Sequence, residues 1–198
     1  MTGLILASSS DVRGKLLSNA GVEFDVIRAR VDESAIKEAL LSEGASSRDI
    51  ADTLAETKAK KVSQKNPSCL VLGCDQVLEH DGRILSKPET PNDAIEQISQ
   101  LNGSTHQLLS AVVLYQNDQP IWRFIGEVRL TMRPLSPAFI AAYVERNWES
   151  IQYCVGCYQL EHEGVRLFSR VEGDFFHVLG LPLIEVLNHL TLIGAIEG

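Results

Sequence analysis

Residues 4–17, LILASSSDVRGKLL, follow the order strand, serine cluster, helix. The apolar run at 4–7 predicts a short buried strand. Residues 11–20 then carry apolar side chains at helical spacing, and Gly21 ends that pattern. A strand that leads directly into a helix is expected in an α/β fold.

The rest of the chain mixes hairpin signals with helix signals. Asp81-Gly82 predicts a two-residue hairpin between an apolar strand at 69–78 and a returning strand at 83–86. The mixture predicts one α/β domain over residues 1–198 with a mixed sheet. The other predicted strands are 24–31, 105–115, 121–132, 152–158 and 165–170, and the other predicted helices are 34–42, 47–65, 90–103, 136–146 and 182–193.

Composition favours an ordinary globular protein, with 44% hydrophobic and 22% charged residues. No apolar run reaches the ~18 residues of a membrane span, and the N-terminus lacks a secretory-signal pattern, so we expect a cytoplasmic protein. The net charge of -8 opposes general binding to nucleic acid or to an anionic membrane. An anionic partner would therefore need positive charge that is gathered locally.

Cysteine and histidine patterns point to no familiar metal site. Cys154 and Cys157 have the spacing of a zinc knuckle, but Cys69 and Cys74 do not, so we interpret all four as thiols, and Cys154 and Cys157 have no clear role. The five histidines show no H-E-x-x-H spacing, and no serine lies in a G-x-S-x-G elbow. A zinc protease and an α/β-hydrolase are therefore disfavoured.

The serine cluster places hydroxyls and free N–H groups at a helix N-terminus, where the helix dipole favours an anion. Ser8 and Ser10 would contribute to a phosphate cradle, and Arg13 would supply a cation one turn into the helix. The alternative is that Ser10 only caps the helix, which serines commonly do.

Asp75 stands in the apolar strand at 69–78, where a carboxylate is costly unless it is paired or binds a metal. A turn centred between Asp81 and Gly82 places Gln76 opposite Lys87 and brings that lysine beside Asp75. A structural ion pair explains this placement as well as a catalytic one does.

Two further charged features lie upstream. Lys58 shares the four-residue repeat of Ile50, Leu54 and Val62, so it lies in the apolar stripe of its helix. Two interpretations are open: the amine binds an anion, or it extends to solvent. Glu33 follows a predicted strand, and an acidic residue there is also a common helix-start preference. Together with the serines and Asp75, these residues predict a metal-dependent phosphoanhydride site.

The order of motifs resembles that of the Maf-like nucleoside triphosphate pyrophosphatases. The similarity extends over nearly the whole chain. It rests on LILASSSDVRGKLL at 4–17, VDE at 31–33, LAETKA at 54–59, GCDQV at 73–77, GRILSKP at 82–88, LNGSTH at 101–106 and RVEGDFFHVLGLPL at 170–183. The resemblance implies a mixed elongated sheet with flanking helices and a central cleft, related to the inosine triphosphatase fold.

The resemblance also implies an activity, which is hydrolysis of a nucleoside triphosphate to the monophosphate and pyrophosphate with a divalent metal, Mg or Mn. By position, Ser8 and Arg13 would contact the phosphates, and Lys58 and Lys87 would stabilise the polyphosphate. Glu33 and Asp75 would serve the metal and the water, with Asp75 as proton acceptor. A homodimer is compatible with the family.

Departures from the family pattern concern specificity. Val12 replaces an arginine, Gln76 follows the aspartate, Cys154 replaces a lysine and Glu161 replaces a glutamine. With these residues, the chain resembles the branch of the family that acts on 7-methyl-GTP rather than on dTTP or UTP. A carboxylate at 161 would accept hydrogen bonds from a guanine edge and favour a cationic base, unless it simply faces solvent. The remaining alternative is a nucleotide-binding regulator of cell division without turnover.

Overall fold

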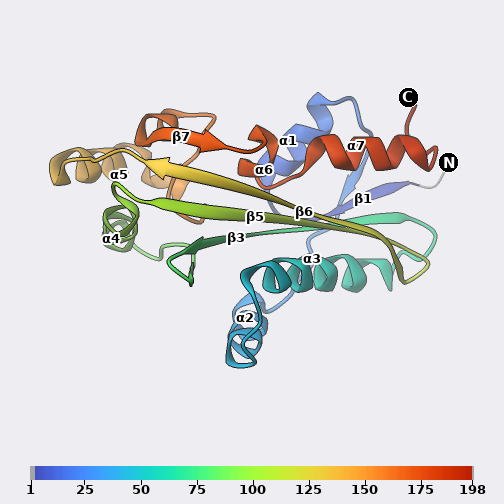
Figure 1. Cartoon of the computed structure of the whole chain (residues 1–198). Helices are drawn as coiled ribbons and strands as arrows, with labels where there is room; N and C mark the ends of the chain where they lie inside the picture. Colours follow the sequence, from blue (N-terminus) through green and yellow to red (C-terminus); the bar gives the residue numbers. More distant parts are fainter. Residues whose placement is uncertain (1–2, 198) are drawn as a thin grey trace. The chain divides into compact units, whose positions relative to one another are not determined.

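The computed structural model describes residues 3–197 (Figure 1). The chain forms two compact units, and each is built from separate segments. The first unit comprises Met1–Gln76, Leu109–Gly126 and Asp174–Gly198, and the second comprises Val77–Leu108 and Glu127–Gly173. The prediction of a single domain over 1–198 therefore stays a prediction. In the described residues, no helix is both long enough and apolar enough to cross a membrane.

The described residues contain a seven-stranded sheet with the order β2-β1-β3-β5-β6-β7, and β4 pairs with β3. β1 is parallel to β2 and β3, whereas β4 is antiparallel to β3 and β7 to β6, so the predicted mixed sheet is confirmed. The strands are β1 Leu4–Ala7, β2 Asp25–Val26, β3 Leu70–His80, β4 Arg83–Leu85, β5 Thr105–Gln116, β6 Gln119–Met132 and β7 Phe168–Glu172.

The predicted hairpin register is also confirmed where β3 and β4 pair. Leu78 lies opposite Leu85, and His80 lies opposite Arg83. Asp81 and Gly82 both have positive φ, 49° and 73°, as a tight hairpin turn requires. The ladder ends at Leu78 and Leu85.

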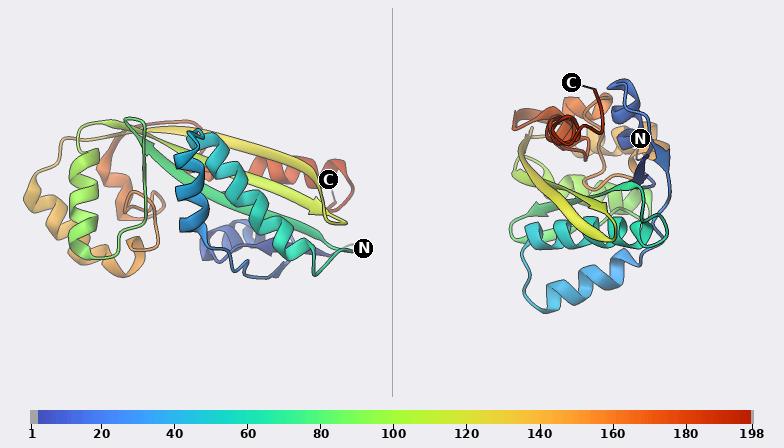
Figure 2. Two further views of the ribbon diagram at one scale, coloured as in Figure 1. Left: turned by 90° about the horizontal axis from the view of Figure 1, so that it is seen from below. Right: turned by 90° about the vertical axis from the view of Figure 1, so that its right-hand side faces the viewer.

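Helices cover both faces of the sheet in the first unit. The helix α3, Ser47–Ser63, lies on one face with α2, Glu33–Ser42, beside it, and α1, Asp11–Asn19, and α7, Leu183–Leu192, lie on the other (Figures 1 and 2). The short helix α6, Phe175–Val178, precedes α7 and has no counterpart in the sequence prediction. On the α1 and α7 face, Leu6, Leu17, Leu72, Leu114 and Val186 belong to one buried apolar cluster.

Gly73 allows α3 to lie directly against β3. A Cβ atom at this position would stand 2.2 Å from the carbonyl oxygen of Ala55 and 2.8 Å from the Cβ of Ala59. No side chain fits in that space, so glycine lets the helix backbone approach the strand. The approach brings the inner face of α3 over the strand segment that carries Asp75.

The second unit contains α4, Pro91–Leu101, packed against α5, Pro137–Ile151, as Figure 2 shows. Ile98 and Leu101 of α4 are buried, as are Ile140 and Tyr143 of α5. A 3₁₀ helix, η1, spans Glu163–Leu167 and leads into β7.

One predicted strand is wrong and two are only partly confirmed: of the strand predicted at 165–170, residues 165–167 belong to η1 and residues 168–170 to β7. Residues 152–158 contain turns instead of a strand, and Gly156 and Cys157, with φ values of 79° and 58°, leave the extended backbone that a regular strand requires. The predicted strand at 24–31 is reduced to Asp25–Val26, whose two side chains are both exposed. Alternating polarity predicts the length of a strand poorly where that strand pairs with one short neighbouring strand and buries neither face.

Candidate functional site

Lys58 joins two carboxylates in the first unit. Its Nζ lies 2.6 Å from Oδ1 of Asp75 and 2.8 Å from Oε1 of Glu33. The side chains of Lys58 and Asp75 are each only 9% exposed, whereas that of Glu33 is 47% exposed. Lys58 therefore points inward from α3 to β3, and the alternative that its amine extends to solvent is wrong.

Burial raises the pKa of the Asp75 carboxyl above its ordinary value, although Lys58 and Arg13 both act in the opposite direction. Desolvation disfavours the charged form, and the two cations restore part of it. A carboxylate with a raised pKa is a better proton acceptor than an ordinary aspartate. The carboxylate of Asp75, whose position in an apolar strand is costly, is thus suited to accept a proton.

Arg13 is a fixed cation, as predicted, and it is 9% exposed. Its Nε donates to the carbonyl oxygen of Gly180 at 2.7 Å, and its Nη1 donates to the carbonyl oxygen of Cys74 and to Oγ of Ser8, both at 3.1 Å. Gly180 has a φ of 86°, and a Cβ there would lie 3.2 Å from Nη2 of Arg13. Glycine is therefore needed where this loop meets the guanidinium.

Ser8 accepts hydrogen bonds from the backbone N–H of Ser10 at 3.2 Å and from Arg13 at 3.1 Å. A hydroxyl that accepts twice can still donate its own proton, which suits a phosphate oxygen. Ser10 occupies the N-cap position of α1, but its side chain makes no capping bond, so the alternative of a side-chain cap is wrong.

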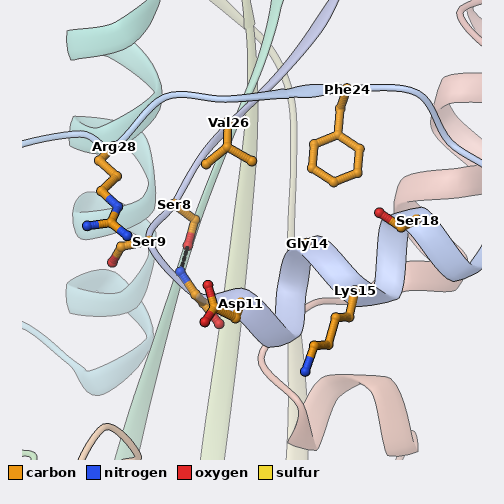
Figure 3. Close-up of a pocket in the computed structure, with 10 residues that line it drawn as sticks. Ser8, Ser9, Asp11, Gly14, Lys15, Ser18, Phe24, Val26 and Arg28 are labelled. Atoms are coloured by element: carbon orange, nitrogen blue, oxygen red, sulfur yellow. Dashed lines mark hydrogen bonds between the residues drawn. The ribbon is translucent and has the colours of Figure 1, made fainter.

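A pocket of about 340 Å³ opens beside the serines, between α1 and the segment around β2 (Figure 3). Ser8 and Ser9 lie at one end of it, and Lys15 and Arg28 lie on opposite walls. Gly14 and Phe24 also line it, and a Cβ at Gly14 would stand 3.8 Å from the ring of Phe24, an ordinary contact distance. Sequence reasoning missed these two cations because they are ordinary surface residues of α1 and of the segment after β2.

Gln76 is held by a different set of contacts. Its Nε2 donates to Oγ of Ser110 and to the carbonyl oxygens of His177 and Val178, each at 3.0 Å. Ser110 also donates to the carbonyl of His177 at 2.7 Å. Gln76 thus fixes the end of α6, two residues before Gly180, and its role in specificity stays a prediction.

Lys87 and Glu161 belong to the second unit and are exposed. The pKa of the Cys154 thiol is raised to about 11: burial is the largest cause, Glu161 also raises the pKa and Lys87 lowers it, so both charges act on this thiol within the unit. The approach of Lys87 to Asp75 stays a prediction, as do the two interpretations of Glu161. Val12 is half-buried in the first turn of α1, and its role also stays a prediction.

A metal would have two carboxylates available here. Among residues 3–197, no three histidine, cysteine or acidic side chains gather as a metal-binding group. Glu33 and Asp75 nevertheless converge on one cation, Lys58. Mg²⁺ is commonly bound by one or two carboxylates together with water and substrate phosphates, so these residues fit such an ion.

Comparison with known proteins gives one consistent result. The sequence profile described as Maf-like protein matches residues 3–193. A nucleoside triphosphate pyrophosphatase of Ruegeria pomeroyi is 56% identical over 194 residues, which cover 98% of each chain. A 7-methyl-GTP pyrophosphatase of Rhizobium meliloti is 44% identical over 194 residues, again 98% of each chain.

Proposed function

Because this chain belongs to the family of Maf-like proteins, we propose that it hydrolyses a nucleoside triphosphate to the monophosphate and pyrophosphate. The observation that supports this most strongly is the buried ion pair of Lys58 and Asp75, which lies beside the fixed guanidinium of Arg13. Carboxylates with raised pKa values concentrate at catalytic sites, which favours turnover over binding alone.

In this proposal, Asp75 accepts a proton from the water that attacks the α-phosphorus. The new P–O bond forms as the bond between the α-phosphorus and the bridging oxygen breaks, and pyrophosphate leaves. Ser8, Arg13 and Lys58 bind phosphate oxygens and stabilise the negative charge that develops on them, and Ser10 and Lys87 add to this set. Glu33 and Asp75 would hold Mg²⁺ or Mn²⁺, which neutralises charge on the phosphates.

The finer proposal is a purine substrate similar to 7-methyl-GTP. It is supported by the carboxylate of Glu161 near Cys154 and by the name of the Rhizobium meliloti relative. The alternative is a dTTP or UTP pyrophosphatase. A cytoplasmic location and a homodimer stay predictions.

Pyrophosphate release by the purified protein tests the proposal, with Mg²⁺ or Mn²⁺ and each common nucleoside triphosphate plus 7-methyl-GTP. We expect Asp75→Asn to lower turnover by about 10²–10⁴-fold, the usual contribution of a general base. Selective turnover of dTTP or UTP would keep the reaction and reject the purine substrate. Nucleotide binding without hydrolysis would favour a regulator of cell division.

A further inference from the structure

One ammonium group holds two carboxylates together. The contacts from Lys58 to Asp75 and Glu33, 2.6 and 2.8 Å, are as short as charge-assisted hydrogen bonds usually are. These are the same two carboxylates that the proposed function assigns to a divalent cation. One acidic pair therefore has two candidate counter-ions.

We propose that Lys58 and a divalent cation are alternative counter-ions of Glu33 and Asp75, so that binding of the cation releases the Lys58 amine to the substrate phosphates. This inference rests on the proposed function and gives Lys58 a second role within it. Lys58 keeps the carboxylates close together and neutralises part of their charge until the cation replaces it.

Charge favours an exchange over joint occupancy. The carboxylates together carry two negative charges, which a divalent cation balances alone, while Lys58 balances one of them. If both cations contacted the same oxygens, they would repel each other in a site where Asp75 and Lys58 are largely shielded from water.

The local structure allows the amine to move while the helix stays in place. Gly73 fixes α3 against β3 through the close approach of Ala55 and Ala59. Lys58 carries its charge on a flexible four-carbon stem, so a rotation of the side chain is enough to redirect it. Arg13 cannot exchange in the same way, because three acceptors hold its guanidinium.

Binding of Mn²⁺ without nucleotide, measured by titration calorimetry, tests the exchange. We expect Lys58→Met to bind Mn²⁺ about tenfold or more tightly than the unmodified protein, because the competing cation is gone. Lys60→Met is the matched control: Lys60 lies on the same helix and is exposed, so its loss should leave the affinity nearly unchanged. Equal affinity in all three proteins, weaker affinity in Lys58→Met, or no binding in any of them would overturn the proposal.

A second readout covers the case in which Lys58→Met folds poorly. Thermal unfolding with and without Mn²⁺ should show a larger rise of Tm in Lys58→Met than in the unmodified protein, because the ion then replaces the missing charge. An equal or smaller rise would count against the exchange. Neither assay measures hydrolysis. If the protein exchanges Lys58 for the divalent cation but hydrolyses no nucleotide, only the proposed function is rejected.

Discussion

Nε of Arg13 donates to the carbonyl oxygen of Gly180 at 2.7 Å, across 167 positions of sequence. The bond links α1 to the loop between α6 and α7, and the same guanidinium reaches Cys74 on β3 and Ser8 after β1. The orientation of this cation thus depends on three separate segments of the first unit.

Gly180→Ala should impair nucleotide binding through Arg13. The new Cβ would lie 3.2 Å from Nη2 of Arg13, so the guanidinium has to shift, and a small misplacement of a binding group is costly. We expect KM to rise about tenfold and the free energy of unfolding to fall by about 1–3 kcal/mol.

Gly21→Ala is the matched control for backbone strain. Gly21 has a similar φ of 73°, and a Cβ there would meet no atom within 4 Å. Steady-state kinetics and urea unfolding on both variants separate the two effects. A rise of KM in Gly21→Ala as large as that in Gly180→Ala would show that strain alone is responsible.

Gln76→Glu should destabilise the first unit, because Gln76 holds the end of α6. The substitution removes the donor to Ser110, His177 and Val178 and turns a carboxylate oxygen toward two carbonyl oxygens. We expect a loss of about 2–3 kcal/mol in urea unfolding. The ratio of kcat/KM between two nucleotides is the second measurement, and a reversed ratio with unchanged stability would instead mean that Gln76 contacts the base.

His106 should make the protein less stable in mild acid. Burial, with a smaller contribution from His80, lowers the pKa of His106 from 6.5 to about 4, and the neutral ring lies 2.8 Å from the Tyr158 hydroxyl oxygen. As the pH falls, His106 is therefore protonated at a higher pH in the unfolded chain than in the folded protein. The stability that the neutral ring contributes is present above pH 6.5 and is lost as the pH falls toward 4. Between pH 7 and 5 the loss should be about 2 kcal/mol.

Urea unfolding of His106→Gln at both pH values measures that contribution. The variant should lose about 2 kcal/mol less than the unmodified protein over this interval. His162→Gln is the control, because His162 is exposed in the same unit. Identical pH dependence in all three proteins would contradict the assignment to His106.

The Cys154 thiol should respond to Glu161. Its pKa of about 11 means that alkylation by iodoacetamide at pH 8.5 is slower in the folded than in the unfolded protein. Glu161→Gln removes a charge that raises this pKa, so the rate at Cys154 should increase about two- to fivefold, the usual range for a partly exposed charge pair. Mass spectrometry of the modified peptide gives the rate, with Glu149→Gln as the control, and an unchanged rate in Glu161→Gln would place the carboxylate away from this thiol.

Local patterns predicted most of the fold. The apolar strand around Asp75, the Asp81-Gly82 turn and the register that follows from it are confirmed, because turn geometry and side-chain alternation depend on neighbouring residues. The prediction failed at residues 152–158, where Gly156 and Cys157 adopt positive φ within an apolar stretch. Polarity alone does not distinguish a buried turn from a short strand.

The sequence by itself determined which chemical groups the candidate site contains, because Ser8, Arg13, Glu33, Lys58 and Asp75 stand out by their unusual positions in otherwise regular patterns. Only the tertiary structure decided how they pair. The ion-pair partner of Asp75 is Lys58, brought there by the close packing of α3 on β3 at Gly73, a pairing that the hairpin pattern did not indicate. Sequence spacing does not encode such contacts, because they depend on how separate elements pack and on where a missing side chain lets two backbones meet.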